Sequence, residues 1–596
     1  MIVNASAHVS SDRHNSTSSY PSLTGACWQL READAWLVAA FMQQHGLPEV
    51  VARVLAGRGM ALEAAEHFLN PSLKASLPDP SHLKDMDIAA ERVAAAVMAG
   101  EQVAVFGDYD VDGATASALL VRYLRALGLA PVAYIPDRMT EGYGPNAKAL
   151  LALKERGVTL VITVDCGTLA FEPLACAHEA GLDVIVVDHH QGEAEKPHCL
   201  ALINPNRLDE TSPHRQLAAV GVAFLLCVAV NRALRNHEPR ALPDLKQWLD
   251  IVALGTVCDV VPLTGVNRAL VAQGLKIMAA RGNTGLRALM DSAALDSRPG
   301  VYHAGFILGP RINAGGRVGK SDLGVRLLTT EDEAEAATLA KELEQHNAER
   351  RAIESLVLED AMAQAEAQEQ GSNMLLLTGE GWHPGVIGIV ASRVKERFNL
   401  PCAVVALKDG MGKASARSVS GFDFGAAVIA ALEAGHLVIG GGHAMAAGFT
   451  VEEAKIPALK AFLEARIQHE TGGLTRERRF MIDAPLNIGG ATEDLLSLLE
   501  KLAPFGQGNP SVRFMLQHVV NIKPEIVGGQ HVRTLLGDRL SGVRLSAIAF
   551  RAVGGALGEQ LFATRGKELH VACQLKNNVW NGKSSVQVQI EDIAAC

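Results

Sequence analysis

The chain has 596 residues, 48% of them hydrophobic, so it is too long for one hydrophobic core and several globular domains are expected. Its formal net charge of −10 by itself disfavours binding to nucleic acid, because attraction to phosphates requires clustered lysine and arginine. Any such surface has to be a local, arginine-lined groove. The nine cysteines include no Cys-x-x-Cys pair, which argues against a disulfide framework or a zinc knuckle and favours the reducing cytoplasm.

The N-terminal part of the chain carries no sign of a membrane anchor. Residues 1–25 are rich in Ser, Thr and Asn and lack an apolar core, which is typical of a disordered tail rather than of a secretion signal. Residues 26–84 are expected to form a helical segment. The longest apolar stretch, Leu217 to Val230, is shorter than the roughly 20 residues of a membrane span, so it predicts a buried helix.

Residues 85–328 repeat a pattern of apolar strand, loop and helix that predicts an α/β domain with a parallel sheet. The expected strands are Glu101 to Phe106, Val132 to Ile135, Leu160 to Val164 and Val184 to Val187, and the apolar run Ile251 to Leu254 reads as another. Acidic clusters follow four of these runs: Asp108-Tyr109-Asp110-Val111-Asp112-Gly113, Asp165, Asp188-His189-His190 and Asp259. The carboxyl ends of parallel strands meet at one edge of a sheet, so we expect these side chains to converge.

Converging carboxylates repel one another unless cations neutralise them, and an oxygen-rich ligand set favours Mg²⁺ or Mn²⁺ over zinc. A pair of such ions roughly 3.5–4 Å apart would suit phosphoester hydrolysis. Taken alone, Asp165 is better interpreted as a helix N-cap after a βα loop, but four such sites together disfavour that interpretation. The first cluster also resembles a calcium loop, but Leu119 stands where the bidentate Glu is required, which excludes that interpretation.

Polar residues in two glycine-bearing segments are candidate substrate contacts. Arg138 and Tyr143 lie in the loop 137–144, just after a predicted strand, where a plain surface loop is the alternative. The segment 309–317 carries Arg311, Asn313 and Arg317 among glycines that allow close backbone approach, and two guanidinium groups can grip a phosphate bidentately.

A long connector helix is predicted for residues 329–372, because residues 331–370 contain no proline or glycine and place apolar residues on one stripe. His346 and Arg350 fall on that stripe, which indicates either a polar cleft or a solvated break. Residues 373–474 predict a second α/β domain, with strands near 374–377, 402–407 and 448–451. Its run Gly440-Gly441-Gly442-His443 reads as a tight turn.

Residues 475–596 change to short alternating strands, expected near 480–482, 513–520, 531–536, 545–550, 568–575 and 585–590. Asn581-Gly582 is typical of a hairpin turn. This spacing suits a small OB-like β-barrel, a fold that binds single strands by stacking and backbone contacts. Phe514 and Trp580 are candidate stacking residues, although a place in the barrel core is the commoner fate of such aromatics.

The order of these motifs resembles the DHH phosphoesterase superfamily and, within it, the RecJ family of single-strand-specific exonucleases. The likeness covers most of the chain, since it extends through the segment 309–317, through Trp382-His383-Pro384-Gly385-Val386-Ile387-Gly388-Ile389, Ala414-Ser415-Ala416-Arg417-Ser418 and Gly441-Gly442-His443, and on to Pro504-Phe505-Gly506-Gln507-Gly508-Asn509-Pro510. It implies a DHH catalytic domain, a DHH-associated domain and a C-terminal OB-like domain.

The resemblance also implies roles for individual residues. Asp110 and Asp259 would hold one divalent cation, Asp112 and His189 the other, and Asp165 would bridge both, with Asp108 as a further ligand or an outer partner. His190 would stabilise charge on the phosphoryl group, or would only support its metal-binding neighbour, and Asp188 would orient its neighbours. Contacts to a terminal phosphate would come from Arg138, Ser415 and Arg417, and His443 and the residues of the segment 309–317 would be further substrate contacts.

The activity implied by the resemblance is metal-dependent 5′ to 3′ hydrolysis of single-stranded DNA to mononucleotides, in recombination and repair. A single-strand-binding protein and a helicase are the implied partners, and a monomer is the implied state. One alternative is a DHH phosphodiesterase for small substrates such as dinucleotides, against which the C-terminal β-domain argues. The other is a non-catalytic DNA-binding relative, which the intact acidic residues disfavour, because unneutralised carboxylates are costly to retain.

Overall fold

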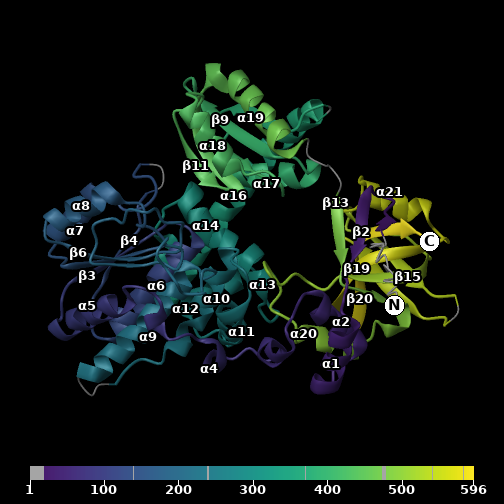
Figure 1. The fold of residues 1–596 in the computed structure, drawn as a ribbon, viewed down its shortest axis with the longest axis horizontal. Helices are drawn as coiled ribbons and strands as arrows, with labels where there is room; N and C mark the ends of the chain where they lie inside the picture. The colour runs from purple at the N-terminus through teal and green to yellow at the C-terminus, as the bar shows by residue number, and fades with distance from the viewer. Residues whose placement is uncertain are drawn as a thin grey trace, which may run out of the picture. The chain divides into compact units, whose positions relative to one another are not determined.

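The computed structural model describes residues 19–137, 140–237, 241–369, 371–472, 478–539, 541–580 and 583–596 (Figure 1). The chain forms two compact units. The larger comprises Pro71–Arg476 together with Pro504–Pro510, and the smaller comprises Met1–Asn70, Glu477–Ala503 and Ser511–Cys596. Most of the predicted N-terminal tail, residues 1–18, lies outside the described residues.

The larger unit begins with a five-stranded parallel sheet in the order β4-β3-β5-β6-β7. Its strands are β3 (Val103–Gly107), β4 (Val132–Tyr134), β5 (Leu160–Val164), β6 (Asp183–Val187) and β7 (Ala201–Ile203). The central strands are buried on both faces, as expected of a parallel sheet. This confirms the predicted α/β class, and β7 is an edge strand that the sequence analysis did not predict.

Helices cover both faces of this sheet (Figure 1). Alternate residues of β3 show the division: Val103 and Val105 pack with α5, α6 and α9, whereas Ala104 and Phe106 pack with α7 and α8. These helices are α5 (Met86–Ala99), α6 (Val111–Ala126), α7 (Ala147–Glu155), α8 (Phe171–Glu179) and α9 (Ala219–His237). Helix α9 has the length and apolarity of a membrane span, but 78% of its most apolar window is buried inside the protein, which is typical of a core helix.

The run Ile251–Leu254 is helical, so its prediction as a strand is wrong. It belongs to α10 (Leu249–Cys258), which is buried along almost its whole length. An unbroken apolar run carries no periodicity, so it cannot distinguish a buried strand from a buried helix. The helical half of the domain continues with α11 (Gly265–Ala279), α12 (Thr284–Ser292), α13 (Val301–His303), α14 (Gly309–Val318) and α15 (Leu323–Thr329).

The connector is a single helix, α16 (Glu333–Gln368), as predicted. Its polar interruption is neither an open cleft nor a solvated break. Arg350 donates to Glu354 at 2.8 Å and to Asn347 at 3.0 Å, and all three residues are buried. These bonds satisfy the set only in part, because Asn347 Nδ2 and Arg350 Nε are buried without a hydrogen bond to any described residue, and Glu354 Oε1 lies 2.7 Å from Arg393 Nη2 outside the set.

The second α/β sheet has the order β11-β12-β10-β9-β8. Its strands are β8 (Leu375–Glu380), β9 (Cys402–Lys408), β10 (Met411–Arg417), β11 (Ile439–His443) and β12 (Ala446–Glu452), with helices α17 (Ile387–Phe398), α18 (Phe424–Glu433) and α19 (Ile456–Thr471). The predicted turn at Gly440–Gly442 is wrong, because these glycines lie within the edge strand β11. A Cβ on Gly440 would come within 2.7 Å of Val428, so the lack of side chains lets α18 pack closely on the strand.

The smaller unit carries the β-rich C-terminal fold. Strand β15 pairs with β19 and also with β17, and the pairing continues from β19 through β20 and β18 back to β17. The strands are β14 (Ala484–Leu486), β15 (Phe514–Asn521), β16 (Glu525–Val527), β17 (His531–Gly537), β18 (Arg544–Ala549), β19 (Glu568–Trp580) and β20 (Lys583–Ala595), with helices α20 (Glu493–Glu500) and α21 (Ala556–Ala563). Phe514 is fully buried, so it belongs to the core and cannot stack on a ligand. The side chain of Trp580 and the predicted turn at Asn581-Gly582 lie outside the described residues.

The N-terminal segment is not only helical. Strands β1 (Ser19–Pro21) and β2 (Ala26–Leu30) precede α1 (Ala35–His45), α2 (Glu49–Gly57), α3 (Ala65–Leu69) and α4 (Leu73–Ser76). Strand β2 pairs in parallel with β13 (Arg478–Ile482), which places Trp28 beside Phe480. The predicted strand at 480–482 therefore joins this small sheet, a pairing between distant segments that local sequence does not reveal.

The segment 504–510 packs on the larger unit, although the residues on both sides of it belong to the smaller one. Leu263 N donates to Gln507 O at 2.8 Å, and buried Asn509 donates to Pro504 O at 2.8 Å. A Cβ on Gly506 would lie 2.7 Å from Leu263. The close packing of Gly506 on Leu263 and the internal hydrogen bond of the loop thus explain why this segment contains glycine and Asn509.

Candidate metal centre

The acidic residues meet at the carboxyl edge of the parallel sheet, as predicted. Asp108, Asp165 and Asp188 each directly follow a strand, namely β3, β5 and β6. Asp110 is the N-cap of α6 and accepts from Gly113 N at 3.0 Å, so the N-cap interpretation applies to it rather than to Asp165. Asp165 instead has a left-handed backbone (φ 60°), which is uncommon for a non-glycine residue and often marks a functional site.

Helix α10 brings Asp259 to the same place although it contributes no strand. Asp259 is the C-cap of α10, and its Oδ2 lies 3.6 Å from His189 Nδ1. The other ring nitrogen of His189, Nε2, lies 3.3 Å from Asp165 Oδ1 and 3.9 Å from Asp112 Oδ2. The imidazole therefore sits among three carboxylates from separate segments of the chain.

Ligand atoms gather in three groups, each with its members within 4.8 Å of one another: Asp108, Asp110 and Asp165; Asp112, His189 and Asp259; and Asp165, His189 and His190. The grouping differs from the expected pairing in two respects: Asp259 stands with Asp112 and His189 rather than with Asp110, and His190, which was given no metal-binding role, joins Asp165 and His189. Asp165 belongs to two groups, which is the position a bridging ligand requires.

The burial of these carboxylates raises their pKa values. Burial, and then the charge of Asp110, raises the pKa of Asp112 to about 7. Burial and the charge of Asp112 raise the pKa of Asp259 to about 9. Burial and the neighbouring aspartates likewise raise the pKa of Asp165 well above its usual value. Proton uptake is how a crowded acidic site lowers its repulsion when no cation is bound.

The donor set fits a hard divalent cation. Within the described part of the chain, Asp165 Oδ1 and Asp259 Oδ2 are buried and accept no hydrogen bond, which leaves them available as ligands. Burial lowers the pKa of His189 to about 4, so its ring is neutral and can bind a metal. The nearby Cys166 is fully buried and its thiol pKa is raised well above the usual value, so it stays an inert thiol.

Asp188 and His190 form a second layer around the cluster. Asp188 accepts from Thr168 N at 3.0 Å and His189 N at 2.7 Å, and its Oδ1 lies 2.7 Å from His190 Nδ1. Although burial opposes a charged imidazole, this hydrogen bond and the charge of Asp188 raise the pKa of His190 to about 9. His190 is therefore a cation at neutral pH, and the carboxylate of Asp188 orients both histidines.

Two supporting residues were not found from the sequence. Asn204 is fully buried and donates to His190 O at 2.8 Å, and Asn206 donates to His189 O at 2.6 Å. They hold the backbone of the Asp-His-His motif in place. Both closely follow the short strand β7, so the rule that polar residues after a parallel strand reach the functional edge would have identified them had the strand been predicted.

A cavity of about 270 Å³ opens over the cluster. Its lining includes Asp108, Asp110, Asp165, Asp259 and His190, joined by Tyr109, Tyr143, Asn313, Gly316 and Arg317. The hydroxyl of Tyr143 donates to Asp165 O at 2.9 Å, which places the tyrosine at the rim of the cluster. Two predicted substrate residues, Asn313 and Arg317, thus reach the cavity.

Arg311 does not line the cavity. Its guanidinium pairs with Glu344 and donates to Ile307 O at 2.6 Å, and the residue is buried. It therefore ties α14 to α16, and its prediction as a phosphate contact is not supported. Arg138 lies outside the described residues.

Ser415 and Arg417 lie on strand β10 of the second sheet. Arg417 donates to Ser415 Oγ at 3.0 Å, and a Cβ on Gly388, in the first turn of α17, would lie 3.1 Å from both Arg417 Nη2 and Ser415 Oγ. Arg317 donates to Gly385 O at 2.7 Å, just before that helix. The start of α17 thus connects the cavity to these two residues. His443 is exposed, two strands from Arg417 in the same row of the sheet.

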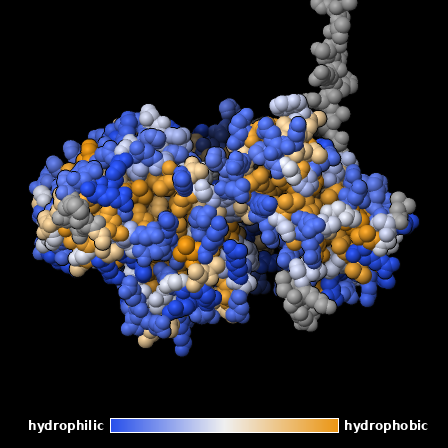
Figure 2. All heavy atoms as spheres, turned by 90° about the horizontal axis from the view of Figure 1, so that it is seen from below, coloured by the Kyte–Doolittle hydropathy of each residue, from blue (hydrophilic) through white to orange (hydrophobic). Residues whose placement is uncertain are grey.

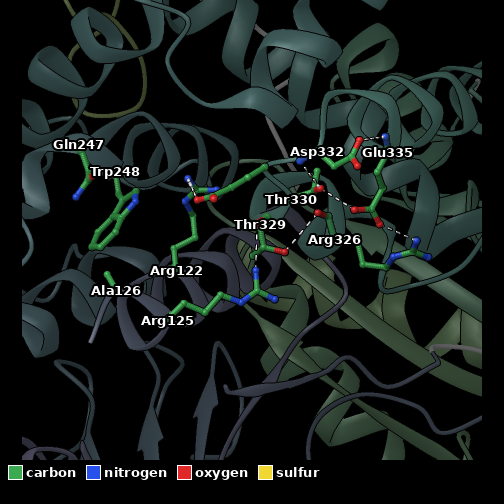
Figure 3. Close-up of a pocket in the computed structure, with 11 residues that line it drawn as sticks. Arg122, Arg125, Ala126, Gln247, Trp248, Arg326, Thr329, Thr330, Asp332 and Glu335 are labelled. Atoms are coloured by element: carbon green, nitrogen blue, oxygen red, sulfur yellow. Dashed lines mark hydrogen bonds and ion pairs between the residues drawn. The ribbon is translucent and has the colours of Figure 1, made fainter. Parts of the chain in front are cut away.

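A larger cavity of about 640 Å³ lies at the far end of α6 and is not the catalytic candidate (Figure 3). Its arginines are engaged: Arg122 donates to Leu328 O and Arg125 to Thr329 O, each at 3.1 Å, and Arg326 pairs with Glu335 at 3.1 Å. These contacts cap the end of α15 and balance the local acidic residues. Cavity volume alone does not identify the functional site, since four of the converging aspartates, Asp108, Asp110, Asp165 and Asp259, line the smaller cavity.

Three family models match consecutive parts of the chain: the DHH family N-terminal domain over residues 102–256, the DHHA1 domain over 371–469, and the RecJ OB domain over 482–592. The chain is 35% identical to the single-stranded-DNA-specific exonuclease RecJ of Escherichia coli (strain K12), over 92% of this chain and 96% of that protein. The chain belongs to the RecJ family. The RecJ exonuclease of Bacillus subtilis (strain 168) is 33% identical over 95% of this chain and 70% of its own length.

Solved RecJ structures share the fold. RecJ from Thermus thermophilus in complex with Mn²⁺ superposes with a TM-score of 0.80 at 32% identity, covering 96% of this chain and 79% of that one. The complex of the same protein with Mg²⁺ gives a TM-score of 0.75 at 30% identity over 96% of this chain and 78% of that one. The multidomain α/β class with an OB domain is thereby confirmed, and RecJ proteins are seen to bind the divalent cations that this donor set favours.

Proposed function

We propose that this chain hydrolyses single-stranded DNA from its 5′ end and releases mononucleotides. The observation that carries the proposal is the convergence of the aspartates and His189 beneath a cavity that also presents Arg317, Asn313 and His190. Relatives at 33–35% identity over most of the chain are single-stranded-DNA-specific exonucleases. A metal-based phosphodiesterase site in that framework fits the same substrate.

The site residues divide into two sets by position. We assign Asp108, Asp110, Asp112, Asp165, His189 and Asp259 to the binding of two divalent cations, Mn²⁺ or Mg²⁺. When bound, such ions would neutralise the phosphate and lower the pKa of a water molecule. His190 would donate a hydrogen bond to a phosphoryl oxygen, and Asp188 would keep it protonated.

The remaining polar residues would hold the strand. Arg317 and Asn313 would contact the phosphate beside the cluster, and Tyr143 would form part of the cavity wall. Ser415 and Arg417, with His443 further along the sheet and Arg138 from the loop after β4, would receive the terminal 5′-phosphate. A pocket with room for only one terminal phosphate would set the direction of digestion. An internal phosphate is joined to another nucleotide on its 5′ side, which such a pocket would exclude.

The proposed setting follows from the substrate. An enzyme of this kind would act in DNA recombination and repair in the cytoplasm, as a monomer, on strands exposed by a helicase and covered by a single-strand-binding protein. Its domains would be the DHH domain at residues 85–328, the connector at 329–372, the DHHA1 domain at 373–474 and the OB domain at 475–596.

The decisive experiment compares a long 5′-phosphorylated single strand, its duplex and a dinucleotide with Mn²⁺ or with a chelator. We expect release of 5′ mononucleotides from the single strand but not from the duplex, and none after chelation. Cleavage confined to the dinucleotide would replace the proposal with a small-substrate phosphodiesterase. Full activity in chelator would remove the metal assignment.

A further inference from the structure

Two aromatic rings stack on each other at the protein surface in the larger unit. Tyr302 is 65% exposed and Phe306 is 72% exposed, and their ring centroids lie 5.4 Å apart at an interplanar angle of 22°. The face of the molecule in Figure 2 is mostly hydrophilic, with apolar residues interspersed. Two large exposed rings in contact with each other are unusual on a surface of this kind. A large apolar side chain left in water forgoes the stabilisation of burial, so such a pair calls for a ligand.

The pair belongs to the same helical stretch as the cavity residues. Helix α13, a π-helical segment at Ala304–Leu308 and helix α14 follow one another without a break, and α14 carries Asn313 and Arg317. Phe306 precedes Asn313 by seven residues, and Arg317 follows Asn313 by four, so the three residues lie within about three turns of one continuous helical stretch. The two rings therefore lie at the N-terminal end of the helical stretch whose C-terminal part lines the cavity.

The π-helical segment fixes the rings to the metal centre. A Cβ on Gly305 would meet Val257 at 3.4 Å, and Cys258 Sγ lies 3.4 Å from Ala304 O. Both partners belong to the last turn of α10, directly before Asp259. Gly506 packs near Val301 from the other side. π-helical segments recur at functional sites because the wider turn redirects the side chains it carries, and here Tyr302 and Phe306 turn away from the core.

The distance suits a nucleotide strand. At 1.5 Å per residue, the seven residues from Phe306 to Asn313 span about 10 Å. A stacked strand rises about 3.4 Å per nucleotide, so the rings stand roughly three nucleotides behind the phosphate at the cavity. Aromatic rings bind bases of any sequence, because every base has a π-face.

The overall charge of the chain makes a contact of this kind useful. A net charge of −10 limits attraction to the DNA backbone, and that attraction weakens as salt rises. Stacking depends on apolar contact and supplies affinity that salt does not screen. We propose that Tyr302 and Phe306 form a stacking platform for the bases at about the third to fifth positions of a single strand whose 5′ end lies in the cavity.

This inference rests on the proposed exonuclease activity, and a protein–substrate double-mutant cycle tests it. The protein variant is Tyr302→Ala/Phe306→Ala, with Leu356→Ala as the control, because Leu356 is 71% exposed on α16 and outside both sites. The substrates are a 5′-phosphorylated strand of about 12 nucleotides, the same strand with abasic residues at positions 3 to 5, and a 5′-phosphorylated dinucleotide.

We expect the double variant to lower kcat/KM on the normal strand roughly ten- to hundredfold, mainly through KM. On the dinucleotide, the kcat/KM of the double variant should equal that of the wild type. On the abasic strand, removal of the bases should already lower the kcat/KM of the wild type, and the double variant should lower it no further. The factor should not change between low and high salt. The control should behave as the wild type on all three substrates, and unchanged thermal unfolding should show that the variant folds.

Three results would overturn the inference: equal activity of the variant and the wild type on the normal strand, an equal loss on the normal and abasic strands, or a loss on the dinucleotide. Either of the first two results would mean that the rings bind a protein partner or no ligand. The third would mean that the rings are needed for the structure of the cavity itself. Wild-type turnover of the normal strand tests the proposed function in the same assay. Its absence would remove both proposals, whereas turnover without coupling would remove only this one.

Discussion

Replacing either of two neighbouring aspartates by asparagine should change the stability of the metal-free protein in opposite directions. Asp165 faces other carboxylates, with ligand atoms of Asp108 and Asp110 within 4.8 Å. At an effective dielectric constant of about 20, two unit charges at that distance repel by about 3 kcal/mol. Asparagine keeps the shape of the side chain and tolerates the left-handed backbone at this position, so Asp165→Asn removes repulsion without new strain.

The gain is smaller than the full repulsion, because Asp165 already relieves part of it by binding a proton. We expect Asp165→Asn to raise the unfolding free energy in chelator by about 1–3 kcal/mol, and by more at alkaline pH than at acid pH. Asp188→Asn is the matched comparison. Its carboxylate accepts N–H groups of Thr168 and His189, and an asparagine amide would turn a donor toward one of them. That change should lower stability by about 1–3 kcal/mol.

Calorimetry with and without Mn²⁺ separates the two effects. In chelator, Asp165→Asn should unfold roughly 2–6 °C above the wild type, and added Mn²⁺ should stabilise it less than it stabilises the wild type. Asp165→Asn should also be inactive. If it unfolds below the wild type in chelator, or keeps its turnover, then Asp165 is neither under repulsion nor a bridging ligand, and the metal assignment fails with it.

Three further predictions address pH, packing and the smaller unit. In the folded, metal-free protein the pKa values of Asp112 and Asp259 are raised to about 7 and about 9, so both residues keep protons that the unfolded chain releases near pH 4. The stability of the metal-free protein should therefore fall as the pH rises from roughly 5 to 9. Melting curves of Asp259→Asn in chelator should show a smaller fall over the same range. Gly255→Ala places a methyl group 2.1 Å from Thr115 Oγ1 and 3.1 Å from Asp112 Oδ1. It should therefore weaken Mn²⁺ binding in calorimetric titration and lower kcat by roughly a hundredfold. Unchanged Mn²⁺ affinity would show that α6 and α10 can separate without moving Asp112. Trp28→Phe leaves the buried carboxylate of Asp592 without the indole donor at 2.7 Å and should cost about 2–3 kcal/mol in denaturant unfolding, while dinucleotide cleavage by the folded protein stays unchanged.

The fold could be predicted where local pattern and topology agree. Four strands of the parallel sheet follow from short apolar runs bounded by loops, and the connector helix follows from a long stretch without proline. The failures have physical causes. Residues 251–254 are buried on every side and show no periodicity, and strand β2 pairs with a strand at 478–482, a long-range contact that no local propensity records.

The site was predictable as a set and less so in its internal geometry. Parallel strands bring their carboxyl ends together, so strand order alone is enough to place Asp108, Asp165 and Asp188 at one edge. Asp259 reaches the cluster as expected, but the end of a helix rather than the predicted end of a strand carries it. Its ligand atom groups with those of Asp112 and His189 rather than with that of Asp110, the residue expected to share an ion with it.

The two arginines of the segment 309–317 show what helical periodicity could have decided. The sequence analysis treated Arg311 and Arg317 as a pair that grips one phosphate. At about 100° per residue, six residues of helix turn the side chain by about 240° beyond a full turn, so both cannot face one cavity. Asn313 and Arg317 differ by only about 40°, and they are the two that line it. Once a segment is known to be an α-helix, its periodicity selects which of its residues reach the substrate.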